Sequence, residues 1–88
     1  MEITVKKPTP QELETLGVKS WGIWTCEAKT FDWQYDDREI CFFLAGKVTV
    51  KAGKQEVHFG TGDLVTFPKG LSCTWIVHEP VRKHYRFG

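Results

Sequence analysis

Long hydrophobic runs and an excess of charge of one sign are both absent from the sequence. No uncharged stretch approaches the roughly 18 residues of a membrane span, and the N-terminus, MEITVKKPTP, has no apolar run of signal-peptide length. The 12 basic and 11 acidic residues leave a net charge of +1, which gives no broad field to attract nucleic acid or an anionic membrane. We therefore expect a cytoplasmic protein that binds neither nucleic acid nor a membrane.

Cysteine is scarce, and its spacing excludes two kinds of site. The three cysteines, Cys26, Cys41 and Cys73, are an odd number and form no C-x-x-C pair, so they suit neither a disulfide framework nor a zinc clip. We expect reduced thiols. Internal repeats and linkers are also absent. With 88 residues, 41% of them hydrophobic, the chain is predicted to form a single domain, residues 1–88, around one core.

One helix and one edge strand are predicted near the N-terminus. Thr9-Pro10-Gln11-Glu12 has the pattern of a capping box, in which Thr9 and Glu12 satisfy each other's backbone N–H groups. The helix should end near Leu16, because Gly17 suits the left-handed position that follows a helix. Before it, the alternation around residues 3–5 indicates a short edge strand.

The rest of the chain has the pattern of an all-β protein. From residue 21 onward, segments rich in β-branched and aromatic residues are separated by Gly, Pro or Asp about every 8 to 12 residues. Four Trp, two Tyr and six Phe are many large rings for so short a chain, so some should line a cavity. Residues 51–54 predict a hairpin turn. Eight strands, which suit a sandwich or small barrel, are expected at residues 21–28, 31–35, 38–44, 47–52, 55–59, 63–67, 72–78 and 81–87.

Two spaced motifs resemble a known superfamily. Glu39-x6-Gly46 is followed by Gly62-Asp63-x4-Pro68-x-Gly70, whose Gly and Pro residues shape the turns on either side of one strand. This pattern resembles the cupin superfamily. The segments WQYDDREICFFLAGKVTV, GDLVTFPKGLSCTW and EPVRKHY resemble the small cupins related to (S)-ureidoglycine aminohydrolase and to ethanolamine-utilisation proteins. The resemblance implies a double-stranded β-helix, or jelly-roll barrel, with a pocket inside one end.

The histidines of the cupin metal centre are missing. Cys73 stands where the second motif has its histidine. Depending on whether the spacer before Glu39 has three or four residues, the two earlier histidine positions hold Tyr35 and Trp33 or Gln34 and Asp32. Only Glu39 and Cys73 remain as ligands, whereas zinc, iron or manganese normally take three or four. We expect no metal centre of the usual kind and no cofactor. The alternative is a weak zinc site with an unassigned third ligand.

Glu39 and Lys83 are the leading candidates for acid/base chemistry or ion recognition. Glu39 shares a strand side with Cys41 and Phe43, so its carboxylate should be desolvated and should seek a partner. Lys83 has the same alternation as Tyr85, which directs its ammonium to the interior if that ring faces inward. A purely structural ion pair, or a lysine that extends to the barrel mouth, is the alternative.

Thiols and aromatic rings complete the predicted site. Cys73 is a candidate nucleophile if Lys83 lowers its pKa, although a free cysteine more commonly packs as a small hydrophobic residue. The candidate ligand-binding residues are Trp33, Tyr35, Cys41 and Trp75. Ordinary core packing explains the three aromatic residues equally well. The histidines, at 58, 78 and 84, are expected on exposed or interfacial positions.

These features predict a small-molecule pocket in a cupin fold. The family resemblance implies metabolism of small nitrogenous compounds, so metal-independent acid/base chemistry is the expected reaction if the protein is an enzyme. A non-catalytic binding or assembly module is the alternative. The strand around Ile3 and Val5 has an edge that a second subunit can cover, and we expect a homodimer.

Overall fold

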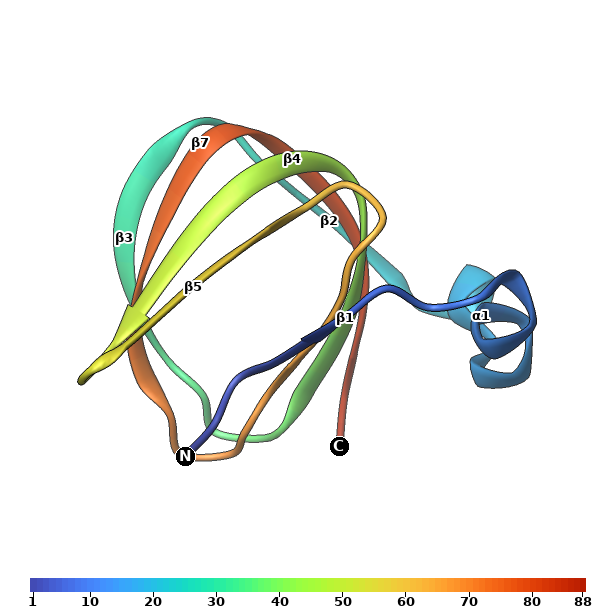
Figure 1. Ribbon diagram of the computed structural model, residues 1–88, viewed down its shortest axis with the longest axis horizontal. Helices are drawn as coiled ribbons and strands as arrows, with labels where there is room; N and C mark the ends of the chain where they lie inside the picture. The colour runs from blue at the N-terminus through green and yellow to red at the C-terminus, as the bar shows by residue number, and fades with distance from the viewer.

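Two long strands, β4 (Glu39–Ala52) and β7 (Ser72–Phe87), organise the computed structural model, which describes all residues, 1–88. They pair antiparallel with each other along most of their length. Five shorter strands flank them: β1 (Thr4–Lys6), β2 (Gly22–Cys26), β3 (Lys29–Gln34), β5 (Gln55–Gly60) and β6 (Leu64–Phe67). The seven strands form one sheet in the order β1-β6-β4-β7-β2. Outside this order, β5 pairs with β4 and β3 pairs with β7. The ribbon curls into an open jelly-roll (Figure 1), as the sequence predicted.

The predicted strands at 38–44 and 47–52 are one continuous strand, β4, and those at 72–78 and 81–87 are one continuous strand, β7. The prediction of eight separate strands was therefore wrong. The register between β4 and β7 shifts three times between Phe43 and Val48, so both strands bend there without ending. Gly46, with φ 116°, allows the bend, because a Cβ atom would lie 2.9 Å from the carbonyl oxygen of Pro80.

The predicted N-terminal helix is confirmed as α1 (Pro10–Leu16), and no helix in the structure meets the length and apolarity needed to cross a membrane. Thr9 Oγ1 accepts from the Glu12 N–H, and the Glu12 side chain accepts from the Thr9 N–H, each at 3.2 Å. Gly17 ends the helix at φ 70°. Together with the short 3-10 helix η1 (Val18–Ser20), α1 covers part of the outer face of the barrel, where a small cluster packs: Val18, Trp21, Ile40 and Leu64.

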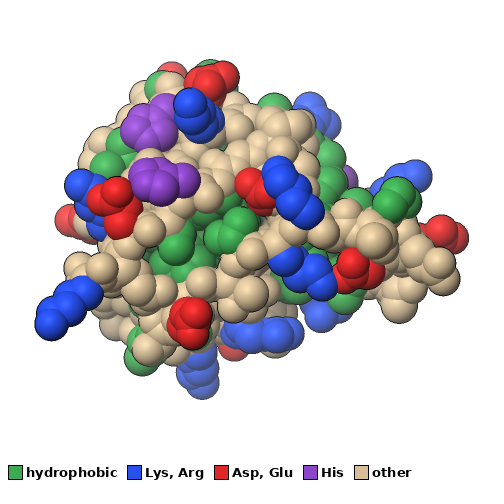
Figure 2. All heavy atoms as spheres, in the orientation of Figure 1, with side chains coloured by type: hydrophobic (Ala, Val, Ile, Leu, Met, Phe, Trp, Pro, Cys, Tyr) green, Lys and Arg blue, Asp and Glu red, His purple; other side chains and the backbone are tan.

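The outer cluster determines which side chains of β4 face inward. Because Ile40 packs on the outer face, its neighbours Glu39 and Cys41 point into the barrel. Basic and acidic side chains are interspersed on the face shown in Figure 2, with apolar side chains visible in a depression near its middle.

Two of the three histidines lie on the outer surface of the barrel, and the third is half-buried. His58 and His78 are exposed, and a ring nitrogen of each lies 2.8 Å from the hydroxyl of Thr49. His84 is half-buried, and its Nδ1 has no hydrogen-bond partner. The expectation of exposed positions is confirmed for His58 and His78.

Candidate functional site

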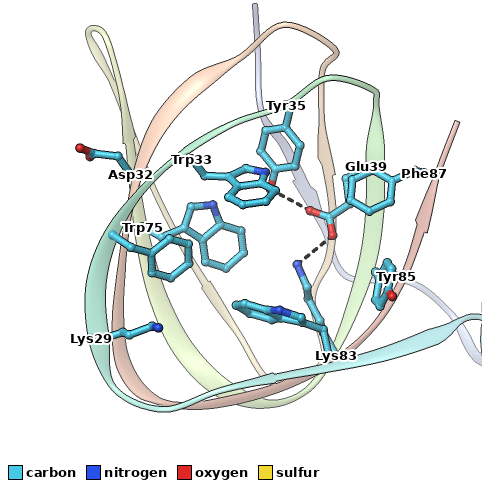
Figure 3. Close-up of a pocket in the computed structure, with 11 residues that line it drawn as sticks. Lys29, Asp32, Trp33, Tyr35, Glu39, Trp75, Lys83, Tyr85 and Phe87 are labelled. Carbon is cyan, nitrogen blue, oxygen red and sulfur yellow. Dashed lines mark hydrogen bonds and ion pairs between the residues drawn. The ribbon is translucent and has the colours of Figure 1, made fainter.

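A cavity of about 460 Å³ opens inside the barrel, between β2, β3, β7 and the start of β4. Aromatic rings form most of its wall, and four charged side chains lie among them (Figure 3). The lining residues are Trp24, Lys29, Phe31, Asp32, Trp33, Tyr35, Glu39, Trp75, Lys83, Tyr85 and Phe87. The cavity therefore has room for a small organic molecule.

A buried ion pair lies at the floor of the cavity. Lys83 Nζ donates to Glu39 Oε2 at 2.9 Å, and the hydroxyl of Tyr35 donates to Glu39 Oε1 at 2.7 Å. Glu39 is 3% exposed and Lys83 is 4% exposed. In Figure 3 the two charged groups point toward each other across the floor of the cavity. The predicted partnership of Glu39 with Lys83 is thus present in the structure.

Two indole rings hold the ammonium of Lys83. Its Nζ lies 4.7 Å from the ring centroid of Trp24 and 4.7 Å from that of Trp75, distances typical of cation–π contacts. An ammonium has three N–H donors, and the only acceptor that Lys83 bonds is Glu39 Oε2. Lys83 therefore retains donor capacity toward a molecule in the cavity.

Tyr35 positions the carboxylate of Glu39. Burial, together with the negative charge of Glu39, raises the pKa of Tyr35 well above its ordinary value of 10.0. The phenol therefore keeps its proton and continues to donate to Oε1. As a result, Oε2 is the oxygen that faces Lys83.

The structure does not bring the two predicted cysteines to the cavity. Cys41 is fully buried in the core, and burial raises its pKa above 9.0 while the charge of Lys83 acts in the opposite direction. Burial also raises the pKa of Cys73, partly offset by the indole of Trp75. We expected Lys83 to lower the pKa of Cys73. That expectation was wrong, because the pKa is raised and the charge of Lys83 is not among the causes of its shift. The Cys73 thiol contacts the carbonyl oxygen of Trp33 at 3.6 Å.

The aromatic walls include rings that the sequence did not single out. Phe31 stacks on Trp75 with centroids 5.9 Å apart, and Trp24 meets the same ring edge-on at 6.0 Å. Trp33 and Phe87 form part of the mouth and are about half exposed. Phe31 could have been found from its alternation with Trp33. The orientation of Trp24 depends on its pairing with Lys83 in the neighbouring strand β7. No local sequence pattern indicates that pairing.

The donor set does not fit the metal that the cupin fold commonly holds. If three residues separate the second histidine position from Glu39, the two missing histidines correspond to Trp33 and Tyr35. Both of these side chains line the cavity. Both oxygens of Glu39 already have partners, one of them a cation. No group of three or more His, Cys, Asp or Glu side chains able to hold a metal ion occurs in residues 1–88. The third ligand required by a weak zinc site is therefore not supplied.

Comparisons with known proteins identify relatives of the chain. The model of the EutQ-like cupin domain family matches residues 13–85. A DUF861 family protein from Thermotoga maritima is 50% identical, over 99% of this chain and 100% of its own, with a TM-score of 0.97. The EutQ protein of Clostridium difficile has a similar fold at 24% identity, over 97% of this chain and 66% of its own, with a TM-score of 0.70. A comparison with curated proteins gives no match.

Proposed function

The chain belongs to the EutQ-like cupin domain family, and from that premise we propose that its cavity binds a small nitrogenous metabolite through Glu39 and Lys83. The observation that carries the proposal is the buried ion pair beside open space: Lys83 Nζ lies 2.9 Å from Glu39 Oε2 at the floor of an aromatic cavity. Buried charges of this kind are uncommon and concentrate at functional sites. The fold by itself assigns no reaction.

The polar floor of the cavity is complementary to a carboxamide or a related planar group. Lys83 has N–H donors beyond the one it gives to Glu39, and the Glu39 carboxylate has lone pairs beyond the two that accept from Tyr35 and Lys83; the donor and acceptor atoms lie 2.9 Å apart. Such a pair matches a carbonyl oxygen and an N–H carried by one small group, and hydrogen bonds to charged partners are stronger than neutral ones. The rings of Trp24 and Trp75 supply apolar faces for the planar remainder of the ligand.

The same pair supplies a base and an acid. Glu39 accepts a proton from a bound N–H group or water, and Lys83 donates one to a carbonyl oxygen or a leaving nitrogen. Tyr35 keeps its proton and holds the carboxylate in place. Metal-independent proton transfer at a nitrogenous compound is therefore the reaction type that we propose.

Two matched ligands test the recognition by Glu39. Benzamide carries both a carbonyl oxygen and N–H donors, whereas N,N-dimethylbenzamide carries only the carbonyl oxygen. We expect titration calorimetry to show at least about tenfold tighter binding of benzamide, because a hydrogen bond to a charged group contributes about 1.5–3 kcal/mol. Equal affinity for the two ligands would exclude the proposed role of Glu39.

Variants at the mouth locate the binding site without breaking the ion pair, whose disruption costs about 3–5 kcal/mol of stability. Trp33 lines the cavity and is 49% exposed, while Ile23 is 43% exposed and does not line it. Trp33→Ala should weaken benzamide binding about threefold to tenfold by loss of a ring contact. Ile23→Ala is the matched control and should leave the affinity unchanged. The same effect in both variants would count against binding in the cavity.

A second candidate function is homodimeric assembly through β1. This strand ends the sheet order and pairs only with β6, so its other edge is free for a second copy. Size-exclusion chromatography with light scattering should then give a dimer, and a monomer at high concentration would oppose this function.

The proposed cytoplasmic location is supported by three cysteines that form no disulfide.

A further inference from the structure

Lys83 combines burial with access to the cavity. It is 4% exposed, its Nζ has one hydrogen-bond acceptor, and it lines a space of about 460 Å³. Figure 3 shows the ammonium directed toward Glu39 between aromatic rings. Lys29 also lines the cavity but is exposed and forms no ion pair, so it is an internal comparison for Lys83.

We propose that Lys83 is a nucleophile that forms an imine with a small aldehyde or ketone entering this cavity. Lysines desolvated in hydrophobic pockets are the ones that form Schiff bases with carbonyl compounds. This inference goes beyond the binding of a nitrogenous metabolite proposed above. It rests on that proposal in one respect only, that the cavity admits a small organic molecule.

Glu39 is placed to free the amine. Transfer of one proton along the 2.9 Å hydrogen bond from Lys83 Nζ to Glu39 Oε2 leaves a neutral amine with a lone pair and a neutral carboxylic acid. Since Oε1 is bonded to the Tyr35 hydroxyl, Oε2 is the oxygen that takes the proton.

The remaining steps balance with water as the only by-product. The Nζ lone pair attacks the carbonyl carbon, a C–N bond forms, and Glu39 returns its proton to the carbonyl oxygen to give a carbinolamine. Glu39 then carries a second proton from the nitrogen to the hydroxyl, the C–O bond breaks, and water leaves. One ammonium and one carbonyl compound give one protonated imine and one water, so the charge is unchanged and no oxidant or reductant is needed.

The surroundings of Lys83 suit the product as well as the amine. The protonated imine is a cation, and it stays between the rings of Trp24 and Trp75 and opposite the restored carboxylate of Glu39. The walls formed by Phe31 and Trp33 favour a carbonyl compound with a planar or apolar substituent. Benzaldehyde represents this class as a probe.

Reductive trapping tests the proposal on the intact protein. Benzaldehyde is added with cyanoborohydride at neutral pH, which reduces an imine to a stable benzylamine, and labelled peptides are measured by mass spectrometry. We expect the ratio of labelling at Lys83 to that at Lys29 to be at least about tenfold higher in the native protein than in urea-denatured protein. A native ratio at or below the denatured ratio would overturn the proposal.

Glu39→Gln adds a test of the proton acceptor. If circular dichroism shows that this variant folds, its labelling ratio should fall to the denatured value, and an undiminished ratio would contradict the role of Glu39. If it does not fold, the comparison of native with denatured protein still decides. Benzamide binding without preferential labelling of Lys83 would reject only the imine. Preferential labelling without benzamide binding would reject only the nitrogenous ligand.

Discussion

Cys41 and Tyr35 carry protons that folding makes harder to remove. Burial raises the pKa of Cys41 above 9.0, with the charge of Lys83 opposing this effect and that of Glu39 adding to it. Burial and the charge of Glu39 raise the pKa of Tyr35 above 10.0. In each case the folded protein keeps a proton at a pH where the unfolded chain has lost it. The stabilisation that each group contributes is therefore fully present below its pKa in the unfolded chain. It is lost as the pH rises from that value toward the pKa in the folded protein.

We predict that the free energy of unfolding falls as the pH rises above 9.0, the ordinary pKa of the thiol. Each buried group contributes up to about 1.4 kcal/mol per pH unit, and Tyr35 adds its share above 10.0. Urea denaturation at a series of pH values measures the slope. Cys41→Ala should reduce this slope, whereas Val50→Ala, which truncates an equally buried side chain that does not titrate, should leave it unchanged. An unchanged slope in Cys41→Ala would refute the explanation.

Residue-level prediction from the sequence succeeded where alternation along one strand was enough. Lys83 and Glu39 were both expected inside and are both almost fully buried. Lys83 does not lower the pKa of Cys73 because the two residues lie in different halves of the bent strand β7. Cys73 pairs with Trp33 of β3, whereas Lys83 pairs with Trp24 of β2. These partners come from strands distant in the sequence, so their identity depends on tertiary pairing. The chemical roles proposed for Glu39 and Lys83 stay predictions.

The bend in β4 allows this one strand to pair with β6 before the bend and with β5 after it. Gly46 lies at this bend and closely approaches β7 at Pro80 and Val81. The sequence suggested a break here, because glycine is common both in turns and at bends within a strand. Only the pairing of β4 with β7 on both sides of Gly46 distinguishes the two.

Gly46→Ala should destabilise the protein strongly. An added Cβ would lie 2.8 Å from a methyl group of Val81 and 2.9 Å from the Pro80 carbonyl oxygen, at a backbone φ of 116°. Gly62→Ala is the matched control, since Gly62 also has a positive φ, 89°, but nothing lies within 4 Å of its Cβ position. We expect a loss of more than about 2 kcal/mol for Gly46→Ala and about 1 kcal/mol for Gly62→Ala by urea denaturation. Equal losses would show that the close approach is unimportant.

At the scale of the whole molecule, the barrel is filled at one end and hollow at the other. Phe59 and Phe67 pack on Trp75 with centroids 5.7 and 5.4 Å away, and Phe31 stacks on the same ring at 5.9 Å. Trp75 thus separates the packed core from the cavity. The motifs implied a pocket inside one end, and the cavity agrees with that expectation. Which rings would line it could not be predicted, because a core ring and a wall ring have the same inward alternation.

The four tryptophans provide the most direct test of the central claim that this cavity binds a small nitrogenous ligand. Trp24, Trp33 and Trp75 line the cavity, whereas Trp21 packs on the outer face in the cluster beneath α1. The measurement is an NMR titration of ¹⁵N-labelled protein with benzamide, observing the indole N–H resonances. If benzamide binds in the cavity, the three cavity resonances should show saturable shifts and the Trp21 resonance should show none. Shifts of Trp21 equal to the others, or no shift of any cavity resonance, would contradict the central claim.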